Sequence, residues 1–370
     1  MKGLSKSLYY GVFSLIAVPL CIWLILSQDT SQQQTKPALK PLAHWKTIGY
    51  FNVPRRAFAA ANTQQHIYVL GGIDINGQYL STVEFAPIHP NGSLGQWTTT
   101  TALNEGRFYL SAVIIGKYLY AIGGANGPLG DDNLPSASVE RAKILPNGEL
   151  GPWQRQAYLT TPRRGLQAVA YKNYIYALGG YNGRFLKTVE RAQVNQQGDI
   201  THWVEEKKDF LVDRYIHSAA IHENRIHLIA GHVEKQNFMS YADVESAQIQ
   251  TNGELAPWKI EATTLNTPRF IASSVTLNNH LYIAGGHDGA NRLTSVEAAP
   301  IMHNGSIGQW KYVLPLNMAR SATMLLAHKN NLYALGGAGG EQLLNSIEHS
   351  QQLPNGKLMS LSTSSQPIEQ

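Results

Sequence analysis

One pattern of residues occurs six times along this chain, and this repeat limits its fold more than any other feature. Each copy begins with an arginine, and a glycine pair, Ala-Gly in the fourth copy, follows 16 residues later. After a spacer of changing length comes a glutamate, and 13 residues beyond it stands a tryptophan, or Leu361 in the last copy. The leading arginines are Arg55, Arg107, Arg163, Arg214, Arg269 and Arg320. Repeats of roughly 50 residues, each able to form one small sheet but not to bury it alone, predict a closed propeller of stacked blades.

The third copy illustrates the strands expected in every blade. A small apolar run at Leu166–Tyr171 precedes a two-residue turn, and an aromatic and aliphatic run at Tyr174–Leu178 ends in glycines. A third run, Lys187–Val194, alternates in polarity, and a fourth begins at Trp203. The Asn-Gly dipeptides of the other copies mark the hairpin between strands three and four. We therefore expect four short antiparallel strands in each copy.

The repeat resembles that of kelch-repeat β-propellers. The matching features are the arginine at the start of strand one, Ile-Tyr before Gly-Gly, Val-Glu in strand three and the tryptophan that opens strand four. The resemblance covers about residues 45 to 360 and implies an all-β, six-bladed kelch-type β-propeller. Kelch propellers serve as protein-binding scaffolds, sugar-binding modules and occasional enzymes, so the resemblance specifies a fold and leaves the function open.

Length and charge exclude some classes of protein. Most of the 370 residues belong to the repeats, which favours one closed ring over two domains. The net charge is only +5 and the lysines and arginines do not cluster. A nucleic-acid partner is therefore not expected.

The amino-terminal segment has the length of a membrane span. Lys2 and Lys6 precede an uncharged stretch, Leu8 to Leu26, whose 19 residues approach the roughly 20 that cross a bilayer. We predict a transmembrane signal anchor at residues 8–27, with residues 1–7 in the cytoplasm and the propeller on the periplasmic, extracytoplasmic side of the cell membrane. The alternative is a cleaved signal peptide, although its apolar region usually has only about 7 to 15 residues.

The remainder of this region carries no folded domain. Cys21, the only cysteine, lies inside the predicted anchor, so an exported domain has neither disulfide nor thiol chemistry. Residues 28–41 are polar and contain two prolines, which predicts a flexible linker. The propeller is expected at residues 42–370.

An unmatched tryptophan predicts how the ring closes. Trp45 stands 10 residues before Arg55, like other strand-four tryptophans, but no first three strands precede it. The sixth copy has three strands and then Leu361 instead of a tryptophan. Residues 45–52 are therefore expected to pair with strand three of the last blade.

Loop lengths differ between the two faces of the expected ring. The distance from glutamate to the tryptophan position is constant, whereas the distance from the glycine pair to the glutamate is 12, 16, 10, 14, 11 and 11 residues in successive copies. Variable loops on a rigid scaffold often carry recognition, so this face is the expected binding face. The alternative is that these loops merely tolerate insertions.

The leading arginines begin the innermost strand and are expected near the mouth of the central channel. The residues that follow them are Arg56, Phe108, Arg164, Tyr215, Phe270 and Ser321. Guanidinium groups among aromatic rings suit a carboxylate or an acidic peptide. The alternative is that arginines present in every copy belong to the framework, as we expect for the repeated glutamates and tryptophans.

Residues that depart from the repeat on the variable loops are further candidates. They are Asp131 and Asp132, Tyr181 and Arg184, His232 with Glu234, and His287 with Asp288. His232 and His287 occupy the same place in neighbouring copies, where a metal site or an acid-base pair can be imagined, but solvated loop histidines are the more common outcome. No metal or cofactor is predicted.

Two hypotheses of function from different classes remain. The first is a membrane-anchored binding scaffold for a protein partner or an envelope glycan. The second is a sugar-ring isomerase similar to exported kelch proteins of the N-acetylneuraminate epimerase (mutarotase) type. A galactose-oxidase-like copper enzyme is excluded because its cysteine is missing, and Asp74-x-Asn76-Gly77 lacks the further ligands of a calcium loop.

Overall fold

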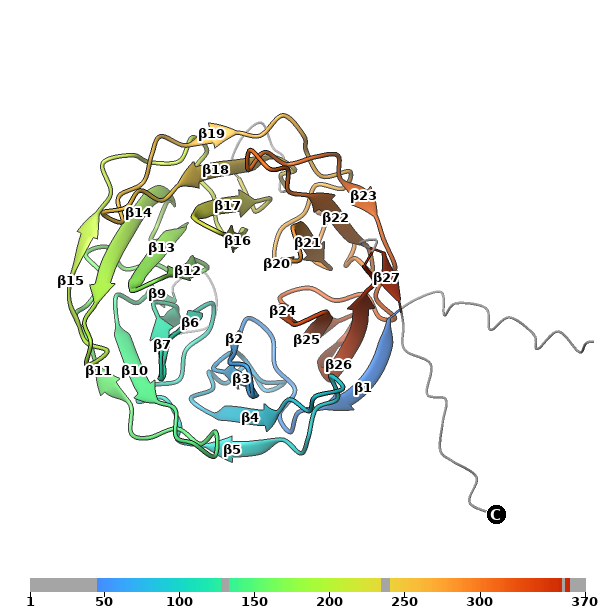
Figure 1. The fold of residues 1–370 in the computed structure, drawn as a ribbon. Coiled ribbons are helices and arrows are strands. Elements are labelled where there is room, and N and C mark those ends of the chain that lie inside the picture. Colours follow the sequence, from blue (N-terminus) through green and yellow to red (C-terminus); the bar gives the residue numbers. More distant parts are fainter. Residues whose placement is uncertain (1–44, 128–132, 234–239, 355–356, 360–370) are drawn as a thin grey trace, which may run out of the picture. The chain divides into compact units, whose positions relative to one another are not determined.

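The computed structural model describes residues 45–127, 133–233, 240–354 and 357–359. These residues form six antiparallel sheets arranged around a common centre, as Figure 1 shows. The predicted all-β, six-bladed propeller is therefore confirmed. Within the described part of the chain no helix could cross a membrane. The predicted cytoplasmic segment, anchor and linker, at residues 1–7, 8–27 and 28–41, lie outside the described residues.

Each of the first three blades is a sheet of four strands in chain order from the centre outwards. Blade one contains β2 (Ala59–Asn62), β3 (His66–Leu70), β4 (Val83–Pro87) and β5 (Thr98–Thr100). Blade two contains β6 (Ser111–Ile115), β7 (Tyr118–Ile122), β10 (Val139–Lys143) and β11 (Gln154–Arg155), and its variable loop adds the hairpin of β8 (Ala125–Asn126) and β9 (Leu134–Pro135). Blade three contains β12 (Gln167–Tyr171), β13 (Tyr174–Tyr181), β14 (Phe185–Val194) and β15 (Ile200–Glu205).

The next two blades repeat this plan, and the sixth joins the two ends of the ring. Blade four contains β16 (Ser218–His222), β17 (Arg225–Ile229), β18 (Val244–Gln248) and β19 (Lys259–Ile260). Blade five contains β20 (Ser273–Leu277), β21 (His280–Ala284), β22 (Val296–Pro300) and β23 (Lys311–Tyr312). Blade six contains β24 (Met324–His328), β25 (Asn331–Gly339), β26 (Gln342–Gln352), β1 (Lys46–Tyr50) and β27 (Leu358–Met359).

The ring closes as the unmatched tryptophan predicts. Strand β1 pairs antiparallel with β26, from Lys46 opposite His349 to Tyr50 opposite Ser346. Trp45 is buried, and its indole Nε1 donates a hydrogen bond to the carbonyl of Leu314, 2.8 Å away. The fourth strand of blade six thus comes from the amino-terminal side of the propeller. The short β27 pairs only with the far end of β26.

A buried ion pair recurs in every blade. In blade three, Arg163 Nη2 lies 2.8 Å from Glu190 Oε1, and Nη1 donates to the carbonyls of Gly179 and Thr188. Glu190 also accepts the backbone N–H groups of Thr160 and Thr161, in the segment that enters the blade. The equivalent pairs are Arg55–Glu84, Arg107–Glu140, Arg214–Glu245, Arg269–Glu297 and Arg320–Glu348. This pair confirms the expected framework role of the repeated glutamates.

In most blades a tyrosine in strand two donates a hydrogen bond to a glycine carbonyl in the hairpin between strands three and four of the next blade. The hydroxyl of Tyr176 in β13 donates to the carbonyl of Gly253 at 2.6 Å. The same bond joins Tyr68 to Gly148, Tyr120 to Gly198 and Tyr333 to Gly92. In blade five the hydroxyl of Tyr282 accepts a hydrogen bond from Gln352. In blade four, His227 takes the tyrosine position, and neither ring nitrogen has a hydrogen-bond partner among the described residues.

Replacing Tyr176 by phenylalanine should lower the free energy of unfolding by about 1 to 3 kcal/mol, because the buried carbonyl of Gly253 loses its donor. Urea denaturation of the full chain measures this loss. The matched control is Tyr158→Phe, since that side chain is largely exposed and should leave stability unchanged. Equal effects of the two substitutions would show that the hydroxyl bond contributes nothing.

Candidate functional site

The six leading arginines lie inside the blades and not in the channel. Their side chains are buried, and burial lowers their pKa while the paired glutamate acts against that shift, as for Arg163 beside Glu190. The expectation that these guanidinium groups approach the channel mouth is wrong, because glutamate and carbonyl oxygens within the blade hold them. The framework alternative describes Arg55, Arg107, Arg163, Arg214, Arg269 and Arg320 better.

The residue after each leading arginine does lie on the variable-loop face, the face that carries the loops between strands two and three. Its backbone pairs with that of the residue after the glycine pair in the same blade. These rim pairs are Arg56–Ile73, Phe108–Ala125, Arg164–Tyr181, Tyr215–His232, Phe270–His287 and Ser321–Ala338. The structure therefore gathers the non-framework candidates on one rim. Sequence reasoning identified both positions but not that they pair.

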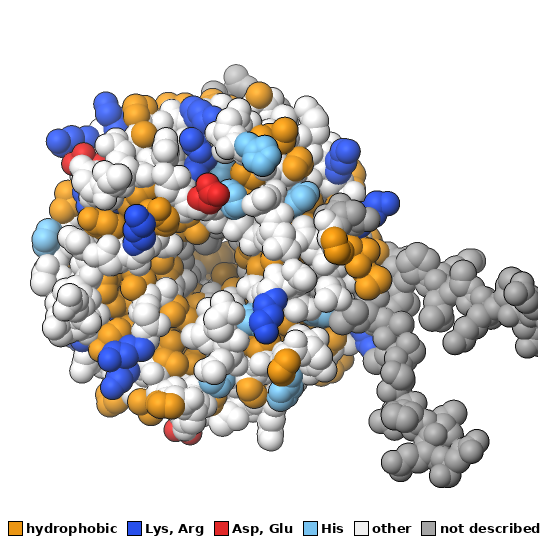
Figure 2. All heavy atoms as spheres, viewed as in Figure 1, with side chains coloured by type: hydrophobic (Ala, Val, Ile, Leu, Met, Phe, Trp, Pro, Cys, Tyr) orange, Lys and Arg blue, Asp and Glu red, His pale blue; other side chains and the backbone are white. Residues whose placement is uncertain are grey.

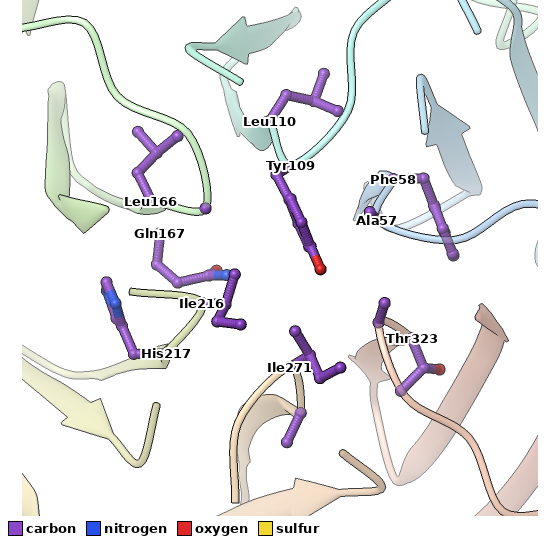
Figure 3. A pocket seen from close by; sticks show the side chains of 13 residues that line it. Ala57, Phe58, Tyr109, Leu110, Leu166, Gln167, Ile216, His217, Ile271 and Thr323 are labelled. Atoms are coloured by element: carbon purple, nitrogen blue, oxygen red, sulfur yellow. The ribbon is translucent and has the colours of Figure 1, made fainter. Parts of the chain in front are cut away.

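The next residue in each blade forms a ring of hydrogen bonds around the axis, termed the collar. Its members are Ala57, Tyr109, Gly165, Ile216, Ile271 and Ala322, all with positive φ. Each N–H donates to the carbonyl of the preceding member, at 2.7–3.2 Å, and the last bond closes the circle from Ala57 to Ala322. Isoleucine rarely adopts a left-handed backbone, so the closed ring of bonds is what holds Ile216 and Ile271 there. Figure 3 shows their side chains and that of Tyr109 projecting toward the centre.

The collar separates two hollows along the axis. On the variable-loop side lies a cavity of about 290 Å³, termed the mouth cavity, whose lining includes Arg56, Tyr109, His287 and Arg292. On the other side, small and apolar residues of the six innermost strands line a hollow of about 300 Å³. Figure 2 shows the ring hollowed at its centre, with hydrophobic side chains in the hollow. Charged side chains therefore line the mouth cavity, and none lines the other hollow.

Aromatic rings cover the rim beside this cavity. The series runs through Tyr79, Phe108, Tyr109, Tyr215, Tyr181, Phe185, His232, Phe270 and His287, with neighbouring ring centroids 4.8–5.9 Å apart. We refer to these residues as the aromatic arc. His232 and His287 each pack against Phe270, at 5.5 and 5.3 Å. In the described ranges no group of three or more His, Cys, Asp or Glu could hold a metal ion.

Arg164 is the most distinctive charged group of the rim. Its guanidinium lies over the rings of Tyr181 and Tyr215, with centroid distances of 4.7 and 5.6 Å. The residue is only 8% exposed, and its Nε has no hydrogen-bond partner among the described residues. No described carboxylate forms an ion pair with Arg164, in contrast to Arg163 beside it.

Arg56 and Arg164 both act on the buried phenol of Tyr109 through their positive charge. Burial raises the pKa of Tyr109, and the positive charges of Arg56 and Arg164 act against that shift. Burial also raises the pKa of Tyr79, again opposed by Arg164. The guanidinium groups of Arg56 and Arg164 therefore both make the surroundings of Tyr109 more positive.

The other candidates have simpler roles or lie outside the described residues. Asp288 Oδ1 accepts the N–H groups of Ala290 and Asn291, and these bonds lower the pKa of its carboxyl. Arg184 is exposed at the tip of the β13–β14 loop. Asp131, Asp132 and Glu234 fall in the ranges that the structure does not describe.

Comparisons with known proteins agree with this architecture. A family model described as "Kelch motif" matches residues 162–191 and 268–298. Beta-scruin and alpha-scruin of Limulus polyphemus are 28% and 30% identical to the chain over 251 residues, which are 65% of this chain and 26% of each scruin. The chain therefore spans about a quarter of the length of these relatives.

Shorter matches and a solved structure extend the comparison. Human kelch-like protein 28 is 33% identical over 86 residues, covering 22% of this chain and 15% of that protein. The structure of YjhT aligns with a TM-score of 0.66 and 16% identity, covering 85% of this chain and 99% of that one. At this identity the likeness to YjhT concerns the fold alone.

Proposed function

Because this chain belongs to the kelch-repeat family, whose propellers generally mediate protein interactions, we propose that it is a binding scaffold that holds an acidic ligand on its variable-loop face. The ligand group enters the mouth cavity, and the aromatic arc packs against the remainder of the ligand. The ligand is an acidic segment of a partner protein, and an acidic envelope glycan is the alternative that the experiment below distinguishes.

The observation that carries this proposal is Arg164. Burying a guanidinium without a carboxylate partner is unfavourable, and stacking on Tyr181 and Tyr215 offsets only part of that cost. A carboxylate supplies the missing acceptor through charge-assisted hydrogen bonds that match the planar guanidinium. Among the described residues no carboxylate fills this role, which supports an anionic ligand.

Location is a separate part of the proposal. We propose that residues 8–27 anchor the chain in the cell membrane and that the propeller lies on the extracytoplasmic side. This rests on the uncharged stretch from Leu8 to Leu26 and on Lys2 and Lys6 before it. Protease treatment of cells without their outer layers tests this location. An extracytoplasmic propeller is digested while the inner membrane is intact, whereas residues 1–7 are digested only after that membrane is opened.

One observation supports an enzyme as the second candidate. Arginine, histidine and tyrosine side chains meet at one cavity, as Arg56, His287 and Tyr109 do. In a sugar-ring isomerase of the N-acetylneuraminate epimerase type, an arginine would hold the sugar carboxylate while a neighbouring group moves the anomeric proton. NMR measurement of anomer exchange separates this candidate from simple binding.

Arg164→Met should abolish ligand binding while changing the free energy of unfolding by less than about 1 kcal/mol, since no described ion pair is lost. Thermal shifts of the full chain are measured with acidic peptides, N-acetylneuraminate, uronic acids and neutral glycans. A ligand at 100 times its dissociation constant adds about 2.7 kcal/mol, which is readily detected.

The control for this variant is Lys143→Met, which removes an exposed positive charge at the end of β10, away from the mouth cavity. It should bind like the native chain. Undiminished binding by Arg164→Met would place the ligand elsewhere. A shift with sugar acids alone, together with faster anomer exchange, would replace the scaffold by the isomerase.

A further inference from the structure

Two arginines, Arg56 and Arg292, line the mouth cavity, and a third, Arg164, acts on Tyr109 in the same lining. From these three arginines on alternate blades we infer that the ligand presents two or three clustered carboxylates rather than one. Arg56 belongs to blade one, Arg164 to blade three, and Arg292 to the loop between β21 and β22 of blade five. This inference rests on the proposed function and adds the charge and compactness of the ligand.

The three arginines differ in their partners from most other described arginines of the propeller, Arg184 and Arg225 excepted. The leading arginines all pair with a glutamate, and Arg141, Arg155 and Arg191 pair with Asp199, Glu105 and Glu206. No described carboxylate pairs with Arg56, Arg164 or Arg292. The Nε atoms of Arg164 and Arg292 are buried without a hydrogen-bond partner among the described residues. Arg141, Arg163 and Arg320 also have a buried Nε without a partner, but each of them pairs with a carboxylate through another nitrogen, which Arg164 and Arg292 do not do with any described residue.

The position of the arginines favours a ligand with more than one carboxylate. One carboxylate pairs with one guanidinium in the two-bond geometry that this group favours. Alternate blades of a six-bladed ring place the three arginines about one third of a turn apart around the axis. A monocarboxylate bound to Arg164 leaves the charges of Arg56 and Arg292 without an anion.

The collar requires the anionic group to be compact. Its closed ring of backbone hydrogen bonds forms the floor of the mouth cavity, so a ligand enters from the variable-loop side and does not pass through the ring. The cavity holds about 290 Å³, which suits a small cluster of carboxylates and not a long chain segment. Tyr109 lines this cavity, and Figure 3 shows its hydroxyl projecting toward the centre, where it can donate to an oxyanion.

The charge around the cavity also favours a ligand with several carboxylates. Its lining contains Arg56 and Arg292 and no aspartate or glutamate among the described residues. Positive groups that surround a cavity raise its potential together, because the low-dielectric walls concentrate the field. Each added carboxylate on the ligand therefore strengthens binding, and binding weakens as salt rises.

The test is a charge series measured on the full chain by isothermal titration calorimetry at constant ionic strength. The probes are propionate, glutarate and tricarballylate, which carry one, two and three carboxylates. We expect affinity to rise along this series, by at least tenfold between propionate and tricarballylate. Arg292→Gln and Arg56→Gln should each reduce tricarballylate binding at least fivefold and change propionate binding less than twofold.

Two control variants separate the position of a charge from its chemical type. Lys143→Gln removes the same charge far from the cavity and should alter tricarballylate affinity less than twofold. Arg56→Lys keeps the charge but loses the planar fork, so partial binding is expected. Equal affinity for all three acids, or tripolyphosphate binding without tricarballylate binding, would overturn this inference while acidic peptides still bind. Failure of acidic peptides and of all three acids would overturn the proposed function as well.

Discussion

Arg163→Met is expected to destabilise the propeller by about 3 to 5 kcal/mol, because it leaves Glu190 as an uncompensated buried charge. Glu190 would keep only the N–H groups of Thr160 and Thr161 as described hydrogen-bond donors. Urea denaturation of the full chain gives the free energy of unfolding of each variant.

The neighbouring residue provides a control of the same chemical type. Arg164→Met removes an arginine that has no described carboxylate partner, and its expected change is below about 1 kcal/mol. The double variant Arg163→Met with Glu190→Leu should regain part of the loss, because it removes both charges together. Similar losses for Arg163→Met and Arg164→Met would contradict the assignment of the first to the framework and the second to the site.

Acid is expected to destabilise the folded chain steeply below about pH 6.5. Burial lowers the pKa of His217 and His227 to about 3, with Arg214 and Arg225 as the next contributions. Burial also lowers the pKa of His349 to about 4, and Lys46 adds to this shift. Histidines in the unfolded chain titrate near 6.5, so below that pH the unfolded state binds protons that the folded state does not.

The loss of stability follows from the difference between the pKa of each histidine in the folded and in the unfolded chain. As the pH falls below 6.5, the free energy of unfolding decreases by about 1.4 kcal/mol per pH unit for each histidine. The decrease ends when the pH reaches the pKa that this histidine has in the folded chain. At pH 4.5 this amounts to about 2.7 kcal/mol for each of the three. Urea denaturation at pH 7.5, 6.0 and 4.5 measures the slope.

Substitution isolates the contribution of one histidine. His227→Tyr should reduce the slope and also stabilise the chain at neutral pH, because a tyrosine at this position can bond to the next hairpin as in the other blades. His303→Gln is the control, because it removes an exposed imidazole from the blade-five hairpin. An unchanged slope in His227→Tyr would rule out His227 as a source of the acid sensitivity.

Recurrence explains which parts of the fold could be predicted. Arginine, glycine pair, glutamate and tryptophan stand at nearly constant positions in each copy, so the blade and its strands followed from spacing. The spare strand at Trp45 predicted the closure for the same reason. The tyrosine bond was missed although its signal was present, because Tyr68, Tyr120, Tyr176, Tyr282 and Tyr333 all stand 13 residues after the leading arginine.

The collar and the site were less accessible to sequence reasoning. Collar residues share a backbone conformation and not a side-chain type, and only Gly165 has the residue type that favours it. Tyr79 and Arg292 lie in loops of variable length, and Phe185 begins β14 directly after such a loop, so no constant spacing marks them. Arg163 and Arg164 are identical in type, and only the recurrence of the first distinguishes framework from site.

The pairing of β1 with β26 has a consequence for the order of folding. Lys46 and His349 are about 300 residues apart, so this pair is among the last contacts that the chain can form. During synthesis the earlier blades can assemble as they emerge, while β1 stays without its partner strand β26. The ring then becomes complete in one late step, when the sixth blade leaves the ribosome.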